Sequence, residues 1–139
     1  MTKTMFAALA FGATVVLAGP ASAEKFKAAL DGKSEVPPTT SAAKGTADID
    51  YDPTIKKVTW TITYSGLTGP PTAAHFHGPA EPGKNAGVAV PIPHPDSSPI
   101  QGSATLTAAQ AADFEAGKYY VNIHTAANPG GEIRGQATK

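Results

Sequence analysis

Short runs in which apolar and polar residues alternate dominate the chain, and this period of two is typical of strands with one buried face. The clearest run is 58–64, where Val58, Trp60, Ile62 and Tyr64 share one side and threonines share the other. Similar segments predict strands at 26–30, 45–51, 73–77, 88–92, 118–125 and 132–137. Glycine- and proline-rich turns separate them. The pattern therefore predicts an all-β chain of short strands.

One segment favours a helix instead. Thr107 is a suitable N-cap for 108–116, a run of good helix formers, and Gly117 follows as a typical residue for the end of a helix. An Asp-Pro turn separates two of the predicted strands, 45–51 and 58–64, which we expect to form a hairpin. Together these elements predict an antiparallel β-sandwich with one short helix.

The N-terminal stretch 1–23 has the features of a secretory signal peptide: Lys3, an apolar run, and small residues ending at Ala23. The apolar run is shorter than the roughly 20 residues that a membrane-spanning helix needs. We therefore expect cleavage after Ala23 and a single domain at 24–139. The protein is expected in the periplasm or outside the cell, without stable membrane insertion.

Charge and cysteine content narrow the classes of function. Removal of 1–23 leaves 10 Lys and Arg side chains against 11 Asp and Glu, so no basic surface for nucleic acid is expected. The chain has no cysteine, which removes disulfides and thiolate metal ligands and leaves imidazole and carboxylate. Neither a Gly-x-Ser-x-Gly motif nor a phosphate-binding glycine loop is present, and no catalytic residues are predicted.

Two of the four histidines stand one residue apart in the segment 73–77. Because side chains alternate along a strand, His75 and His77 face the same side, while Phe76 faces the opposite, apolar side. Two imidazoles on one face of a strand can share a metal ion.

A third histidine, His124, lies in the segment 118–125. There Val121 and Ile123 form the apolar face, and Asn122 shares the other face with His124. We expect this strand to meet the His-x-His strand, so that three imidazoles form a candidate metal site. A hydrogen-bonded histidine cluster beneath the loops is the alternative interpretation.

Imidazole ligands without thiolate fit Cu(II) or Zn(II), and the absence of a nearby carboxylate cluster argues against Ca²⁺ and Mg²⁺. We expect a copper ion, with zinc as the alternative. His94, in a proline-rich segment, is a candidate fourth ligand, although it equally suits an exposed turn. Glu132 and Arg134 share a strand face after the third histidine; they are candidates to support the ligands, or an ordinary cross-strand ion pair.

Three segments resemble, in the same order, the motifs of the CHRD domain, a module first described as a repeat in chordin. They are Leu-Asp-Gly followed by Glu-Val-Pro-Pro within 30–38, AAHFHGPA at 73–80, and YVNIHTAANPGGEIRGQ at 120–136. The resemblance covers nearly all of 24–139. It implies a β-sandwich of immunoglobulin-like or superoxide-dismutase-like form.

The His-x-His strand is also similar, locally, to the copper strand of Cu/Zn superoxide dismutases, and Arg134 to their guiding arginine. The chain departs from those enzymes in having no disulfide and no evident zinc loop. Three functions are compatible with these observations: metal binding for storage, handling or protection; a copper-only enzyme of the dismutase type; and a metal-free adhesion or protein-interaction module. We expect binding rather than catalysis.

Overall fold

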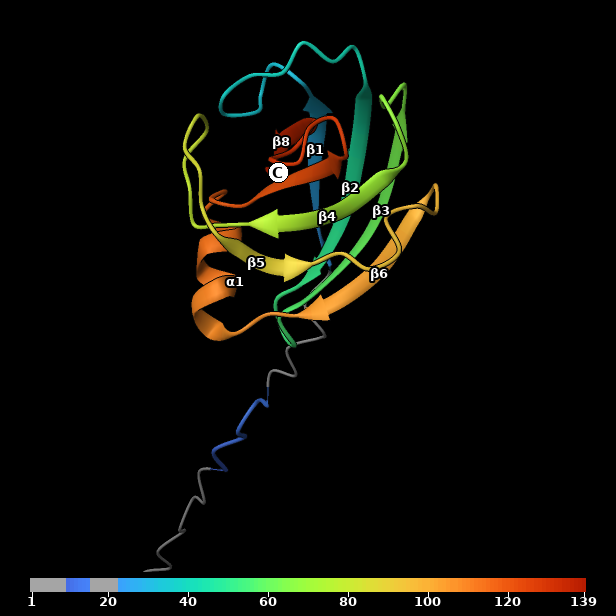
Figure 1. Cartoon of the computed structure of the whole chain (residues 1–139). Helices are drawn as coiled ribbons and strands as arrows, with labels where there is room; N and C mark the ends of the chain where they lie inside the picture. Colours follow the sequence, from blue (N-terminus) through green and yellow to red (C-terminus); the bar gives the residue numbers. More distant parts are fainter. Residues whose placement is uncertain (1–9, 16–22) are drawn as a thin grey trace, which may run out of the picture.

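The computed structural model describes residues 10–15 and 23–139, and its architecture is all-β with one short helix (Figure 1). The strands are β1 (Glu24–Asp31), β2 (Lys44–Asp52), β3 (Lys57–Ser65), β4 (Pro71–His77), β5 (Val88–Pro91), β6 (Ile100–Thr105), β7 (Tyr120–Thr125) and β8 (Ile133–Gln136). Helix α1 spans Ala108–Glu115. Most of the expected signal peptide, 1–23, lies outside the described residues.

All the named strands pair antiparallel in one sheet, in the order β5-β4-β7-β8-β1-β2-β3-β6. The sheet curves strongly, so that β4 and β5 lie in front of β1 and β2 (Figure 1). The rings of Trp60 on β3 and Phe76 on β4 lie 5.3 Å apart between their centroids, which joins the two halves through the core. This arrangement confirms the predicted antiparallel, sandwich-like fold.

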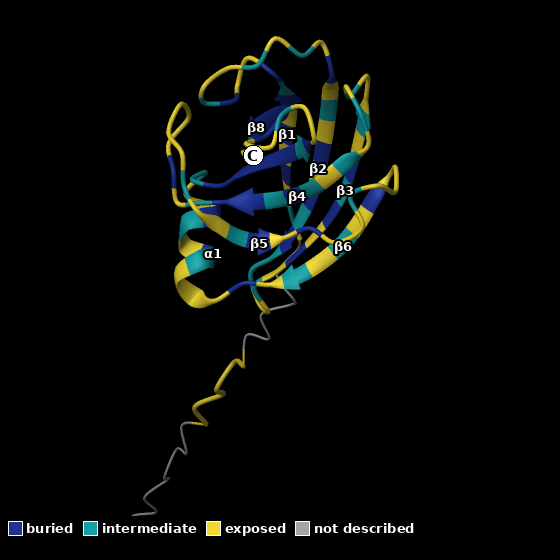
Figure 2. Ribbon diagram, in the orientation of Figure 1, coloured by how far each residue is buried: buried dark blue, intermediate teal, exposed yellow. Residues whose placement is uncertain are grey.

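The core consists of the residues that the alternating pattern assigned to the inner face (Figure 2). The large residues Trp60, Ile62, Phe76, Val121 and Ile123 on these faces are buried, and Phe114 of the helix joins them, whereas Tyr64 is only partly buried. The β2–β3 hairpin also forms as expected, with Ile49 opposite Trp60. The phase of the strands is therefore correct, and it determines which face carries the histidines.

Helix α1 begins as the sequence predicts. The Thr107 side chain accepts a hydrogen bond from the Gln110 amide, and the Gln110 side chain accepts one from the Thr107 amide, which completes a capping box. Gly117 follows the C-cap with φ 74°. Phe114 packs on Phe26 of β1, with 4.5 Å between the ring centroids, so the helix closes one end of the core. In the described part of the chain, no helix has the length and apolarity needed to cross a bilayer.

Strand β6 was not predicted from the sequence. It pairs with β3, and its residue opposite Trp60 is Gly102. A Cβ atom added to Gly102 would lie 2.7 Å from the Trp60 ring, so the indole occupies the space that a side chain on β6 would need. Beyond Ile100, the strand therefore lacks the large apolar residues by which an alternating pattern is recognised.

Candidate metal centre

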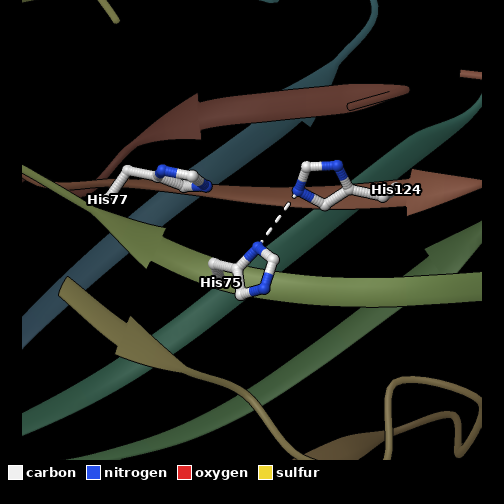
Figure 3. Close-up of side chains that lie close together, drawn as sticks. All are labelled: His75, His77 and His124. Carbon is white, nitrogen blue, oxygen red and sulfur yellow. Dashed lines mark hydrogen bonds between the residues drawn. The ribbon is translucent and has the colours of Figure 1, made fainter. Parts of the chain in front are cut away.

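Strands β4 and β7 pair directly and bring three histidines together, as the sequence predicts. His75 lies opposite Asn122, and His124 lies opposite Ala73. The His75 Nδ1 and His124 Nε2 atoms are 3.1 Å apart, and one ring nitrogen from each of His75, His77 and His124 lies within 4.8 Å of the others (Figure 3). The three imidazoles thus form one cluster on a single face of the two strands.

The spacing of the ring nitrogens is compatible with one shared ion. Two nitrogens that each lie about 2.1 Å from a metal are at most about 4.2 Å apart. The His75 to His124 separation of 3.1 Å already satisfies this limit. Because all the nitrogens lie within 4.8 Å of one another, the three rings need to move closer together before all of them coordinate one ion.

Backbone carbonyls fix the tautomer of two of the histidines. His77 Nδ1 donates to the carbonyl of Ala86, and His124 Nδ1 donates to the carbonyl of Pro129, each across 2.9 Å. A carbonyl oxygen only accepts, so the proton of each neutral ring is on Nδ1 and the lone pair is on Nε2. Metal-binding histidines are commonly oriented in this way. The two Nε2 atoms are therefore available as ligands.

Burial favours the neutral, metal-binding form of His75 and His77. It lowers the pKa of His75 and of His77 below the usual 6.5. The nearby imidazoles act in the same direction, because a second positive charge in the cluster is unfavourable. At neutral pH the lone pairs of these rings are thus not occupied by protons.

Asn122 lies among the histidines, with only 2% of its surface exposed. Its Oδ1 atom is 2.9 Å from His77 Nε2 and 3.0 Å from His124 Nε2. The sequence analysis placed Asn122 on the face of His124 but gave it no role. The signal was present, since a polar residue two positions before a candidate ligand on the same strand face points to the same site.

Tyr120 and Arg134 support His77 without a hydrogen bond to it. The Tyr120 ring stacks on the His77 ring, with 4.8 Å between centroids and 5° between planes. Its hydroxyl accepts from the amide of Ala86, the residue whose carbonyl anchors His77. The Arg134 guanidinium lies over the Tyr120 ring, 3.4 Å from the ring centroid. These contacts hold the His77 ring in one orientation.

Arg134 also orders the loop that precedes Ala86. Only 2% of its surface is exposed, and its guanidinium donates to Asn85 Oδ1 across 2.9 Å and to the carbonyl of Lys84. Its charge is therefore directed into the protein. The three ion pairs between described side chains include neither Arg134 nor Glu132, so the predicted cross-strand ion pair does not form.

Glu132 orders the turn on the other side of the site. Its carboxylate is fully buried and accepts hydrogen bonds from Ser41, Thr68, Thr125 and Asn128. Burial raises the pKa of Glu132, but the donated hydrogen bonds outweigh this effect and lower it to about 2. Because Asn128 precedes Pro129, the carboxylate stabilises the turn whose carbonyl anchors His124. Neither Glu132 nor Arg134 donates to or accepts from a histidine.

Glu35 is a buried carboxyl that the sequence analysis missed. It lies in a proline-rich passage with 4% of its surface exposed, and its Oε1 atom has no hydrogen-bond partner among the described residues. Burial raises its pKa to about 7, although the charge of Arg134 and a hydrogen bond with Asn122 oppose the shift. Asn122 therefore lies between this carboxyl and the histidines.

His94 is the one histidine outside the cluster. It is exposed in the turn after β5, with φ 56°, and its carbonyl accepts from the amide of Ser97. A role as fourth ligand stays a prediction.

Comparison with known proteins gives one family. The model of the CHRD domain matches residues 26–137, a range that contains His75, His77, His124, Glu132 and Arg134. No curated protein and no solved structure gives a significant match to the chain.

Proposed function

The chain belongs to the CHRD domain family, and from that premise we propose that it is an exported metal-binding protein whose ligands are His75, His77 and His124. One observation carries the proposal. Three ring nitrogens from two paired strands converge, and two of these rings have their other nitrogen anchored to a backbone carbonyl. Lone pairs that face one another in a partly buried site are favourable when a cation lies between them.

The support around the ligands fits a site built to hold an ion. Arg134 orders the loop that anchors His77, and Glu132 orders the turn that anchors His124. Rings that are oriented before the metal arrives lose little conformational entropy on binding. We therefore propose that Arg134 and Glu132 support the ligands indirectly, by ordering the loop and the turn whose backbone carbonyls bind His77 and His124.

Copper is the proposed ion. The residues of the cluster offer imidazole without thiolate or carboxylate, a donor set that suits Cu(II) and Zn(II), and Cu(II) is the tighter-binding of the two at most nitrogen sites. Export is proposed from the signal peptide at 1–23, with Glu24 as the first residue after cleavage. N-terminal sequencing of the protein recovered outside the cytoplasm tests the cleavage site.

Binding is favoured over dismutase-type turnover by the position of Arg134. A residue that attracts superoxide must present its charge to solvent. Arg134 is buried, stacks on Tyr120 and donates to the loop at Lys84 and Asn85. We therefore propose a role in copper storage, handling or protection.

The experiment is a calorimetric titration of Cu(II) and Zn(II) into the protein, purified without a tag that binds metal. One ion per chain is expected. The double variant His75→Ala/His77→Ala should lose stoichiometric binding. His94→Ala is the matched control, because it removes an exposed histidine outside the cluster; a weaker affinity in this control would identify His94 as a ligand. Undiminished binding in the double variant would overturn the proposal.

A further inference from the structure

The contacts of Asn122 are unfavourable unless a positive charge is present. Its Oδ1 atom faces His77 Nε2 and His124 Nε2 at 2.9 and 3.0 Å. An amide oxygen only accepts, and both Nε2 atoms carry lone pairs because the Nδ1 protons are donated to carbonyls. His75 Nδ1 can donate to His124 Nε2 across 3.1 Å, but no proton lies between Asn122 Oδ1 and either Nε2 atom, which is unfavourable for a buried amide oxygen.

Two arrangements without a metal relieve the conflict, and the surroundings oppose both. Protonation of His77 or His124 at Nε2 places an imidazolium in a partly buried cluster beside other imidazoles. Reversal of the Asn122 amide directs Nδ2 to the histidines, but then the hydrogen bond between the amide and the Glu35 carboxyl is lost.

Gly131 leaves the space in which the Asn122 amide and the Glu35 carboxyl lie side by side. Its φ is 124°, which favours glycine, and an added Cβ would meet the Glu35 carboxyl and lie 2.6 Å from Asn122 Nδ2. The absence of a side chain there lets the carboxyl and the amide nitrogen approach the same point. The amide nitrogen is thus directed to Glu35, and the amide oxygen to the histidines.

We propose that Asn122 is the fourth ligand of the site and binds the metal through Oδ1, so that the donor set is three imidazole nitrogens and one amide oxygen. The inference rests on the proposed metal binding. Ligand atoms about 2.0–2.1 Å from one ion lie about 2.9–3.4 Å apart at neighbouring positions. The distances from Oδ1 to His77 and His124, and from His124 to His75, are 2.9, 3.0 and 3.1 Å.

An oxygen donor changes which ions the site prefers. Amide oxygen and imidazole suit divalent ions such as Cu(II) and Zn(II), whereas soft sulfur ligands select Cu(I). The site is therefore expected to hold Cu(II) more tightly than Cu(I). This behaviour suits handling of the oxidised ion.

The test uses Zn(II) and Cu(II) as probes and starts with the wild-type protein. In ¹³C-labelled protein, Zn(II) should shift the side-chain carbonyl carbon of Asn122, whereas the side-chain carbonyl carbon of Gln101, exposed on β6, serves as an internal control that should not move. Cu(II) electron paramagnetic resonance should report three imidazole nitrogens and one oxygen donor. Neither measurement needs a variant, so a folding defect cannot obscure the answer.

Variants of Asn122 then test whether its side-chain oxygen binds the metal or whether the side chain only fills space. Asn122→Leu keeps the approximate volume but removes the oxygen, and it should weaken Zn(II) binding by about 10- to 100-fold. Asn122→Asp keeps an oxygen donor and adds a charge, so it should bind at least as tightly as wild type. Gln101→Glu adds the same charge at an exposed position of β6, outside the cluster, and should change the affinity less than twofold.

The outcomes distinguish this inference from the proposed function. Absence of metal binding in the wild type would overturn both. Metal binding through the histidines, with an unmoved Asn122 carbonyl carbon and unchanged or tighter binding in Asn122→Leu, would overturn only the assignment of Asn122. That result would mean that its amide is reversed and donates to the histidines.

Discussion

Replacement of Glu132 by glutamine tests the network that holds the third histidine in place. The carboxylate accepts from Ser41, Thr68, Thr125 and Asn128, and its pKa is lowered from 4.5 to about 2. A carboxyl with a lower pKa in the folded than in the unfolded state stabilises the fold above pH 4.5, and this stability is lost as the pH falls toward 2. At 1.36 kcal/mol per pH unit, the contribution at neutral pH is about 3 kcal/mol.

Glu132→Gln removes the charge and turns an amide NH₂ toward groups that donate. The free energy of unfolding at pH 7 should fall by about 3 kcal/mol or more, because buried donors lose their acceptor. The difference from wild type should shrink as the pH approaches 2, where the wild-type carboxyl also becomes protonated. The turn at Pro129 should loosen as well, so the affinity for Cu(II) should drop about tenfold.

Urea denaturation at several pH values from 7 to 2 measures this effect. Trp60 is the only tryptophan of the chain and is buried against Phe76, so its fluorescence reports unfolding of the core. Glu81→Gln, at an exposed loop position, is the matched control and should follow the wild-type curve. Equal stability of Glu132→Gln and wild type at pH 7, or pH curves that run parallel, would refute the reasoning.

Three further predictions concern the fold. The pKa of Glu35 is raised to about 7, so its ionised form is disfavoured in the folded state. The free energy of unfolding of the wild type should therefore fall by about 3 kcal/mol between pH 4.5 and 7. Urea denaturation of Glu35→Gln should not show this fall. Phe76→Ala should cost about 3–5 kcal/mol, and an unchanged melting temperature would mean that the strand phase is wrong. Gly135→Ala places a Cβ against the Ala29 backbone and should cost about 1–3 kcal/mol, whereas Gly87→Ala, in open space, serves as its control in the same thermal melts.

The sequence predicts the strands whose inner residues are large and apolar. In β3 the alternation of Trp60 and Ile62 with threonines determines both the element and its buried face. The same reasoning orients β4 through Phe76, and hence places His75 on the opposite face. Strand β6 could not be predicted in this way, because the Trp60 ring of β3 occupies the space that a side chain at position 102 would need, and the residue there is glycine.

The sequence predicts the members of the histidine cluster but not its supporting contacts. The spacing of His75 and His77 on one strand is a local property, so alternation is enough to place them together. The burial of Glu35 depends on Gly131 and Arg134, which are about a hundred residues away along the chain. No local pattern distinguishes such a carboxyl from an exposed one, and the carbonyls that anchor the histidines carry no sequence signal at all.

Copper binding by the histidine cluster is tested most directly by calorimetric titration of Cu(II) into wild-type protein and into His75→Ala/His77→Ala, at pH 7 and at pH 5. The wild type should bind one ion at pH 7 and bind it more weakly at pH 5, since protons compete for imidazole below about 6.5. The double variant should bind none stoichiometrically. Equal binding of copper by the two proteins would contradict the assignment of the site.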